Sequence, residues 1–178
     1  MQFPEHFPEL QTSRLLLRAV TVADRDAIFA LRSNEEVNRF VGRDAAQTPA
    51  DAARFISDRI QDIIENKGMY WAIESRTTGK LIGTICYWNL NDNDNSAEIG
   101  YELLPDMQGQ GIMQEAIVPV IAWGFNDMRL EVITAFPLEV HGRSVKLLEK
   151  NDFSYDEIID GHLFYKLSRQ VWQLHQPI

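Results

Sequence analysis

The sequence predicts a mixed α/β fold: a central, mostly antiparallel, twisted sheet of six or seven strands, flanked by about four helices. Three observations predict it. Several segments carry apolar residues at helical spacing, short apolar segments typical of strands lie between them, and tight turns join neighbouring strands. One strand–helix–strand step, over residues 96–136, predicts a parallel pair within this sheet.

The length of 178 residues suits one domain with a sizeable core. We expect a single domain over residues 1–178, because no Gly-, Pro- or Ser-rich linker divides the chain. The tripeptide Phe-Pro-Glu occurs twice, at residues 3–5 and 7–9. Two prolines so close together favour an extended chain over a helix, so residues 1–11 are expected to form an extended N-terminal arm.

The formal net charge is −9. This charge argues against a nucleic acid as the main partner, because binding to a phosphate backbone needs a basic face. An acidic protein attracts amines and other cations, so the charge mildly favours a cationic substrate. The alternative, that acidity only keeps the protein in solution, stays open.

Several classes of protein are excluded by other features. No apolar run approaches the roughly 18 residues of a membrane helix, and the N-terminus lacks the features of a signal peptide. Cys86 is the only cysteine, which excludes an intrachain disulfide and a cysteine-based zinc site. His6, His162 and His175 lack the spacing of metal ligands. We therefore expect a cytoplasmic protein with no membrane partner and no metal.

Four segments are predicted as helices. In the first, Thr21 is a plausible N-cap, and Asp24 three residues later completes a variant of the capping box. The second opens with Thr48-Pro49, which places proline at the first helical position. The third contains Pro119, which costs about 3 kcal/mol or a kink inside a helix. The four helices are expected over residues 21–31, 48–65, 111–125 and 143–150.

Seven shorter segments are predicted as strands. The turn at residues 77–80 joins two of them in a hairpin, and the polar segment 89–95 is expected to be a loop. The strands are expected over residues 14–18, 69–74, 81–88, 96–104, 132–136, 153–159 and 162–167.

The loop Gln108-Gly109-Gln110-Gly111 lies between a predicted strand and a predicted helix. Two glycines at the start of a helix let a ligand approach the backbone closely. The free N–H groups of the first turn and the positive end of the helix dipole suit an anion. Each charge-assisted bond to a diphosphate contributes about 1.5–3 kcal/mol. The alternative is a glycine-rich turn with no ligand.

Two other kinds of phosphate loop do not match. A Walker loop needs Gly-Lys-Ser/Thr, and here Gly111 is followed by Ile112-Met113. A dinucleotide fingerprint needs a third small residue where Gln114 stands. Glu131 lies about 20 residues beyond Gly111, where a ribose-binding acid would be sought, but the loop follows four strands rather than the first.

The loop resembles motif A of the GNAT superfamily of N-acetyltransferases, whose pattern is Gln/Arg-x-x-Gly-x-Gly/Ala. Gln108 and Gly111 match this pattern, whereas Met113 occupies the final small position. The resemblance spans roughly residues 10–167 and is strongest to the branch that contains the ribosomal-protein alanine N-acetyltransferases. Three further stretches carry it, at residues 10–18, 97–103 and 144–153. In addition, His141 stands where the family usually has Asn, and Asp152 replaces a usual Gly.

The resemblance implies acetyl-CoA as co-substrate and a GNAT-like sheet. It implies that a bulge splays the strand before the loop, and that the backbone of Leu103 and Leu104 then bonds the pantetheine arm and the thioester carbonyl. His141 is implied as a coenzyme contact, with a plain surface residue as the alternative. The diphosphate is expected on the N–H groups of Gln108, Gly109, Gln110, Gly111, Ile112 and Met113.

Acetyl transfer to an amine needs a neutral amine, a stabilised oxyanion and a proton for the thiolate. Ser144 matches the family serine that is proposed as the acid; alternatively, it is a helix N-terminal residue bonded to backbone. Glu98 lies on the strand that enters the site and is a candidate base acting through water, unless it faces solvent. The family's second glutamate has no clear match, because Asp160-Gly161 alone joins the last two strands.

Three functions follow from these features. The leading one is transfer of the acetyl group of acetyl-CoA to a primary amine, either a protein N-terminus or a small amine, by a monomer or homodimer. The second is a catalytically silent acyl-CoA-binding module, which Met113 and the unassigned base motivate. The third is a nicotinamide-dependent enzyme.

Overall fold

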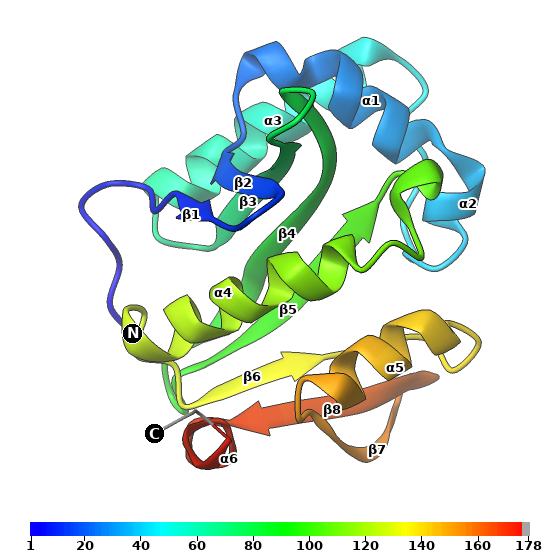
Figure 1. The fold of residues 1–178 in the computed structure, drawn as a ribbon. Helices are drawn as coiled ribbons and strands as arrows, with labels where there is room; N and C mark the ends of the chain where they lie inside the picture. Colours follow the sequence, from blue (N-terminus) through cyan, green and yellow to red (C-terminus); the bar gives the residue numbers. More distant parts are fainter. Residues whose placement is uncertain (176–178) are drawn as a thin grey trace.

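The computed structural model describes residues 1–175, so the last three residues of the expected range 1–178 lie outside it. Eight strands form one sheet in the order β1-β2-β3-β4-β5-β6-β8-β7 (Figure 1). All neighbouring strands are antiparallel except β5 and β6. The strands are β1 (Leu10–Gln11), β2 (Leu15–Ala19), β3 (Met69–Ser75), β4 (Lys80–Asn91), β5 (Ser96–Leu103), β6 (Val132–Ala135), β7 (Ser154–Ile159) and β8 (His162–Ser168).

Helices cover both faces of this sheet (Figure 1). The described α-helices are α1 (Arg25–Ser33), α2 (Glu35–Asn38), α3 (Pro49–Ile64), α4 (Ile112–Asn126), α5 (Gly142–Lys150) and α6 (Arg169–Leu174). Two short 3-10 turns, η1 (Val22–Asp24) and η2 (Pro105–Met107), precede α1 and α4. None of the helices within residues 1–175 is long and apolar enough to cross a bilayer.

Two apolar cores show which helix covers which face. The larger core joins α4 and Leu148 of α5 to one face of the central strands. The smaller core joins Ile28 of α1 and Ile56 of α3 to the opposite face. Because side chains alternate along a strand, β5 contributes to both sides. Its residues Ile99 and Leu103 belong to the larger core and so face α4.

The predicted fold class and the parallel pair around residues 96–136 are confirmed. The strand count was too low by one, because Leu10–Gln11 of the expected arm pairs with β2 as the edge strand β1. The helix count was also low, since α2 and α6 are short elements of four and six residues that periodicity does not reveal.

The prediction of a loop over residues 89–95 was partly wrong. β4 continues to Asn91, which pairs with Ser96 across the hairpin, and only residues 92–95 form the turn. Polar composition favours a loop, but pairing to a neighbouring strand overrides this preference. Asn95 adopts a positive φ of 51°, a conformation that asparagine tolerates better than most residues.

Helix α4 packs tightly against β4 through Gly124. A Cβ atom at Gly124 would lie 2.5 Å from the Tyr87 hydroxyl oxygen. That hydroxyl donates a buried hydrogen bond of 3.0 Å to the Val120 carbonyl. Pro119 is accommodated within the helix, which is continuous from residue 112 to 126.

We predict that Gly124→Ala destabilises the protein by about 1–3 kcal/mol, because the added methyl overpacks the contact with Tyr87. Helix propensity alone would give the opposite sign, a gain of about 0.5–1 kcal/mol. Urea denaturation measures the difference. Gly142→Ala is the matched control, because no atom lies within 4 Å of its Cβ position. A Gly124→Ala protein as stable as the control would contradict the prediction.

Candidate functional site

The pairing between β5 and β6 stops halfway along β5. The register runs from Ser96 and Val132 to Glu98 and Thr134, whereas β5 continues to Leu103. The two strands diverge beyond that point (Figure 1). The pairing of β5 with β4 is regular from Glu98 to Leu103, so the bulge expected before the loop is not there. The opening arises because β6 ends early, and it leaves one edge of β5 without a partner strand.

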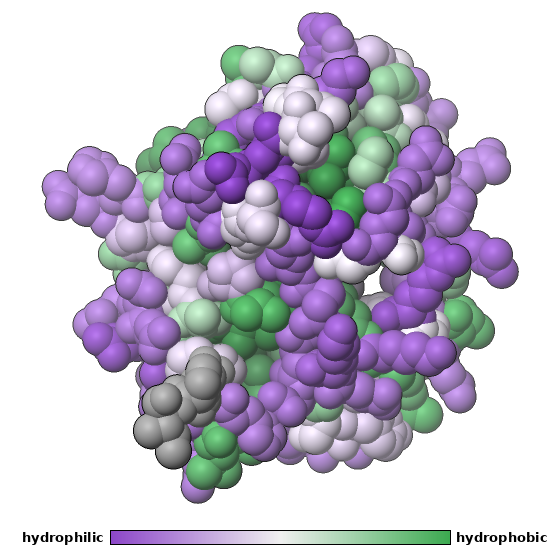
Figure 2. Space-filling view, viewed as in Figure 1, coloured by the Kyte–Doolittle hydropathy of each residue, from purple (hydrophilic) through white to green (hydrophobic). Residues whose placement is uncertain are grey.

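A cleft of about 810 Å³ lies at this opening. Residues 99–102 of β5 and residues 135–137, at the end of β6 and just beyond it, line the cleft, together with side chains from helices on both faces of the sheet. Figure 2, drawn from the same side as Figure 1, shows an opening in the surface at this place. The cleft therefore gives access to β5 from both faces of the sheet.

Tyr101 and Ser144 meet on the α4 side of the cleft. Tyr101 lies on β5, and Ser144 lies in the first turn of α5, with its side chain buried. Their hydroxyl oxygens are 2.8 Å apart. Burial raises the pKa of Tyr101 to about 12, although the hydrogen bond to Ser144 opposes this shift. Tyr101 thus remains protonated at neutral pH and joins Ser144 in a hydroxyl pair across the opening.

Glu98 lies on the opposite face of β5 and also lines the cleft. Its side chain is partly buried and accepts a hydrogen bond of 3.3 Å from the Asn89 amide. Burial raises the pKa of the Glu98 carboxyl, and this outweighs the opposite effects of Asn89 and His162. A carboxyl with a raised pKa in a cleft is better suited to accept a proton than a fully solvated one.

Both glycines of the loop adopt a backbone conformation that other residues rarely adopt. Gly109 and Gly111 have φ angles of +73° and +72°, in the left-handed region. Gly111 occupies the N-cap position of α4, and no side-chain hydrogen bond caps the start of this helix. Within the described residues, no acceptor faces the backbone N–H groups of residues 109–113. Unpaired N–H groups at the start of a helix are the usual donors to phosphate.

Three backbone groups that the family resemblance assigned to the coenzyme are already engaged within the chain. The Gln108 N–H donates to the Pro105 carbonyl at 3.0 Å, and the Leu104 N–H donates to the Ile82 carbonyl at 3.0 Å. The Leu103 carbonyl accepts a bond of 3.2 Å from the Gln108 side chain. The free donors of the loop are therefore those of residues 109–113.

Arg143 brings a positive charge to the loop. Its guanidinium, on the first turn of α5, donates a hydrogen bond of 2.8 Å to the Gln108 side-chain oxygen. The local sequence of the loop, residues 108–113, contains no cationic side chain. Arg143 is separated from Gln108 by 35 positions, so only the folded chain places it there.

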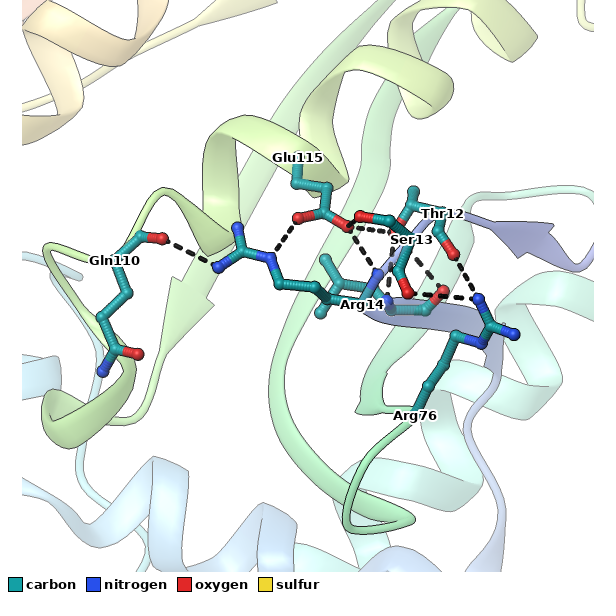
Figure 3. Close-up of polar contacts among 7 residues, drawn as sticks. Thr12, Ser13, Arg14, Arg76, Gln110 and Glu115 are labelled. Atoms are coloured by element: carbon teal, nitrogen blue, oxygen red, sulfur yellow. Dashed lines mark hydrogen bonds and ion pairs between the residues drawn. The ribbon is translucent and has the colours of Figure 1, made fainter.

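A second cation, Arg14, is held beside the loop by Glu115 (Figure 3). Arg14 precedes β2, and its guanidinium bonds Glu115 at 2.5 Å and the Gln110 carbonyl at 3.1 Å. The Glu115 carboxylate also accepts bonds from the hydroxyls of Thr12 and Ser13. This cluster joins the N-terminal segment to the first turn of α4 and so holds the loop in place.

Glu115 has a low pKa as a result. Burial alone would raise it, but the bonds from Thr12, Arg14 and Ser13 lower the pKa of this carboxyl to about 2. The carboxylate is therefore charged at every physiological pH.

His141 lies at the N-cap of α5 and lines the cleft. Its ring stacks on Phe40, with centroids 4.2 Å apart and an interplanar angle of 8°. Burial and the nearby Arg143 lower the pKa of His141, which favours the neutral ring. The Ser144 hydroxyl is bonded to Tyr101 rather than to this imidazole.

The structure thus divides the expected site residues into two groups. Glu98, His141 and Ser144 line the cleft, whereas residues 108–113 lie at the start of α4 and do not line it. Met113 belongs to the larger apolar core, so its side chain does not cover the loop. The roles of Tyr101, Arg14 and Arg143 were not predicted from the sequence, although Tyr101 and Arg14 lie in the stretches 97–103 and 10–18 that carry the family resemblance.

Comparison with known proteins places residues 14–154 in a family described as an acetyltransferase (GNAT) domain. The chain is 35% identical over 158 residues to the uncharacterized N-acetyltransferase YoaA of Bacillus subtilis, covering 89% of each chain. It is 30% identical to the uncharacterized N-acetyltransferase p20 of Bacillus licheniformis, covering 90% of this chain and 97% of that protein.

Solved structures share the fold. A ribosomal-protein-S5-alanine acetyltransferase from Vibrio fischeri superposes with a TM-score of 0.81 at 20% identity, covering 93% of this chain and 98% of the other. A spermidine N-acetyltransferase from Vibrio cholerae, in complex with CoA and spermine, gives a TM-score of 0.80 at 20% identity, covering 91% and 99%.

We predict that Glu115→Gln lowers stability at pH 7 and that this loss shrinks as the pH falls. Because the folded-state pKa of Glu115 is about 2 and the ordinary value is 4.5, its contribution is complete above about pH 4.5 and is lost on acidification toward pH 2. Urea denaturation of both proteins at pH 7 and pH 3 measures the change. The exposed-arm variant Glu5→Gln serves as control. A pH-independent difference between wild type and Glu115→Gln would refute the prediction.

Proposed function

The chain belongs to the GNAT family of acetyltransferases, and from this we propose that it transfers the acetyl group of acetyl-CoA directly to a primary amine. The observation that most directly supports this proposal is the edge of β5 that lacks a partner strand, between the Tyr101–Ser144 pair and Glu98. The three groups that the reaction needs thus lie around one opening: a proton donor, a carboxylate, and backbone donors for the oxyanion.

Coenzyme A would approach from the α4 side. Its diphosphate would accept bonds from the free N–H groups of residues 109–113, and the guanidiniums of Arg14 and Arg143 add positive charge beside them. Its pantetheine arm would follow the open edge of β5 near Leu103. The Leu104 N–H takes no part, because it is bonded to Ile82.

The acceptor amine would approach from the opposite face. Glu98 would take a proton from the ammonium or the attacking amine, through a water molecule. The amine nitrogen attacks the thioester carbonyl, and a backbone N–H on the open edge of β5 bonds the resulting oxyanion. The C–S bond then breaks, and the Ser144 hydroxyl gives its proton to the thiolate. Tyr101, which is protonated at neutral pH, then passes its proton to Ser144 across their hydrogen bond and is reprotonated by solvent, while Glu98 releases the proton of the amine to solvent.

A catalytically silent acyl-CoA-binding module was the alternative, and it rested on Met113 and on the unassigned base. The Met113 side chain is packed in the core, so it gives no reason to expect an obstructed loop. Glu98, with its raised pKa, is a candidate for the base. The acetyltransferase function is therefore the better supported of the two.

We predict that Gly111→Val weakens acetyl-CoA binding by tenfold or more, about 1.4 kcal/mol or more, because its side chain would stand where the phosphate must approach. Isothermal titration calorimetry with acetyl-CoA measures this. The matched control is Gly79→Val in the β3–β4 turn, where φ is also positive, at +63°, and no atom lies within 4 Å of the Cβ position. If Gly111→Val bound as well as the control, the loop would not hold the phosphates.

We predict that variants of the acid and the base differ in their pH profiles. Ser144→Ala should lower kcat about 10²-fold with little change in KM, because it removes a proton donor needed only during transfer.

Glu98→Gln should remove the acid limb of the pH profile of kcat/KM. Since the pKa of Glu98 is raised, wild-type activity should increase with pH through a value above the ordinary 4.5. Thiol release from acetyl-CoA reports both. An unchanged acid limb in Glu98→Gln would exclude Glu98 as the base.

A further inference from the structure

Three arginines gather at the α1–α3 end of the cleft, although the protein as a whole is acidic. The cleft is lined by Arg32 of α1, by Arg43 from the segment between α2 and α3, and by Arg59 of α3. Arg43 contacts Glu102 at 2.6 Å, and Arg59 contacts Asp62 at 2.7 Å. Among the carboxylates of residues 1–175, none pairs with Arg32. This end of the cleft therefore has one positive charge that is not offset by an ion pair.

Arg32 is held in a defined place. Its guanidinium carbon lies 3.7 Å from the centroid of the Phe55 ring, and the guanidinium of Arg59 lies 5.2 Å from the same centroid. Burial, followed by repulsion from Arg43, lowers the pKa of Arg32. Guanidiniums crowded in a half-buried place repel one another, so an anion bound among them would relieve this repulsion.

Two further donors line the same end of the cleft. The Arg59 Nε atom and the Tyr70 hydroxyl are buried and make no hydrogen bond of good geometry in the described part of the chain, although Thr84 lies beside Tyr70. Among the same described residues, the Glu102 Oε2 atom is the one buried side-chain acceptor in this state. Buried donors are almost always bonded, and the Glu102 carboxylate, which Arg43 already contacts, offers too few acceptors for all of them; a bound anion would supply the others. With Arg32, these donors form a set suited to a carboxylate or a phosphate.

The opposite end of the cleft carries a negative charge, that of Glu98. Along β5, Glu98, Gly100 and Glu102 are alternate residues and share the face turned away from α4, with Glu102 at the arginine end. Glu102 is paired with Arg43, whereas Glu98 has only the Asn89 amide. Four strand residues span roughly 13 Å, so Glu98 lies about that far from the arginine end along β5.

Gly100 adds no side chain to the floor between the two ends. Its cross-strand partner is Cys86, and a Cβ atom at Gly100 would lie 3.3 Å from the Cys86 sulfur and 3.5 Å from the Trp88 indole nitrogen, so these two β4 side chains form the floor here. No side chain from β5 therefore rises between Glu98 and Glu102, and an extended molecule can lie along this face.

We propose that the acceptor is a zwitterion, an amine that also carries a carboxylate or phosphate, with the anion bound by Arg32, Arg59 and Tyr70 and the amine beside Glu98. This rests on the proposed acetyltransferase function and on Glu98 as the amine end. An extended chain spans at most about 3.3–3.6 Å per residue, so a di- or tripeptide fits the separation better than a single amino acid. A polyamine would place a second ammonium among the arginines, which repel it.

The test compares acceptors that differ only in the anion. Glycine, diglycine and triglycine are assayed as free acids and as C-terminal amides, with acetyl-CoA and thiol release as the readout. An aminoalkyl phosphate and its parent amino alcohol form the phosphate arm, and spermidine is the polycation. Wild type is compared with Arg32→Gln, with the charge-retaining Arg32→Lys, and with Arg54→Gln, an exposed arginine of α3 paired with Asp51.

The expected result is a kcat/KM about tenfold or more higher for triglycine than for its amide, through KM, as the loss of one charge-assisted bond would give. Arg32→Gln should abolish this preference, Arg32→Lys should restore part of it, and Arg54→Gln should behave as wild type. A stronger effect on the phosphate pair would assign the anion as phosphate. Equal use of acids and amides, preference for spermidine, or an acid preference that survives Arg32→Gln would overturn the proposal while the acetyltransferase function stands.

If wild type acetylates no amine, the proposed function fails, and binding then decides the anion site separately. Titration calorimetry of triglycine free acid and the aminoalkyl phosphate into the protein with coenzyme A should show binding of at least one. That binding should be about tenfold weaker in Arg32→Gln and unchanged in Arg54→Gln. Absence of binding to wild type, or equal binding to Arg32→Gln, would overturn the anion site as well.

Discussion

The site depends on one constraint: β6 ends at Ala135 while β5 continues to Leu103, so half of β5 has a backbone edge without a partner strand. Backbone donors and acceptors must be bonded or solvated, and an open edge inside a sheet is a place where an extended ligand can supply the missing bonds. The rest of the site is arranged around this edge. Helix α5 brings Ser144 to one side of it, and the cleft extends from there to the opposite face of the sheet.

Alternation along β5 separates the two halves of the proposed reaction. Tyr101 lies on the face of β5 that packs toward α4 and α5, and it contacts Ser144. Glu98 lies on the opposite face of β5, the same face as Glu102. A donor and a base on opposite faces of one strand cannot neutralise each other, yet both reach the open edge. The same alternation places Gly100 between two glutamates, which keeps the acceptor side open.

The glycine loop at residues 108–111 is held by contacts from outside its own segment. Glu115 holds Arg14 and the hydroxyls of Thr12 and Ser13, and this ties the N-terminal segment to the first turn of α4. Arg143 approaches the loop from α5. The net charge of −9 therefore says little about the site, because guanidiniums are concentrated both at this loop and at the far end of the cleft. Charge distribution, rather than total charge, decides which ligand each end attracts.

By itself, the sequence determined the features that depend on local chemistry. Helical periodicity placed α3 and α4, and Pro49 stands at the first helical position of α3, as its place after Thr48 implied. The positive φ angles of Gly109 and Gly111 fit the close backbone approach that two glycines at a helix start allow. The sequence missed β1, the extension of β4 to Asn91 and the short helices, because pairing and packing with distant segments create them. Only the tertiary structure decided the site: the hydroxyls of Tyr101 and Ser144 are 43 positions apart in sequence, and Arg14 reaches Gln110 across 96 positions. Contacts over such separations depend on where the strands part, which no local pattern encodes.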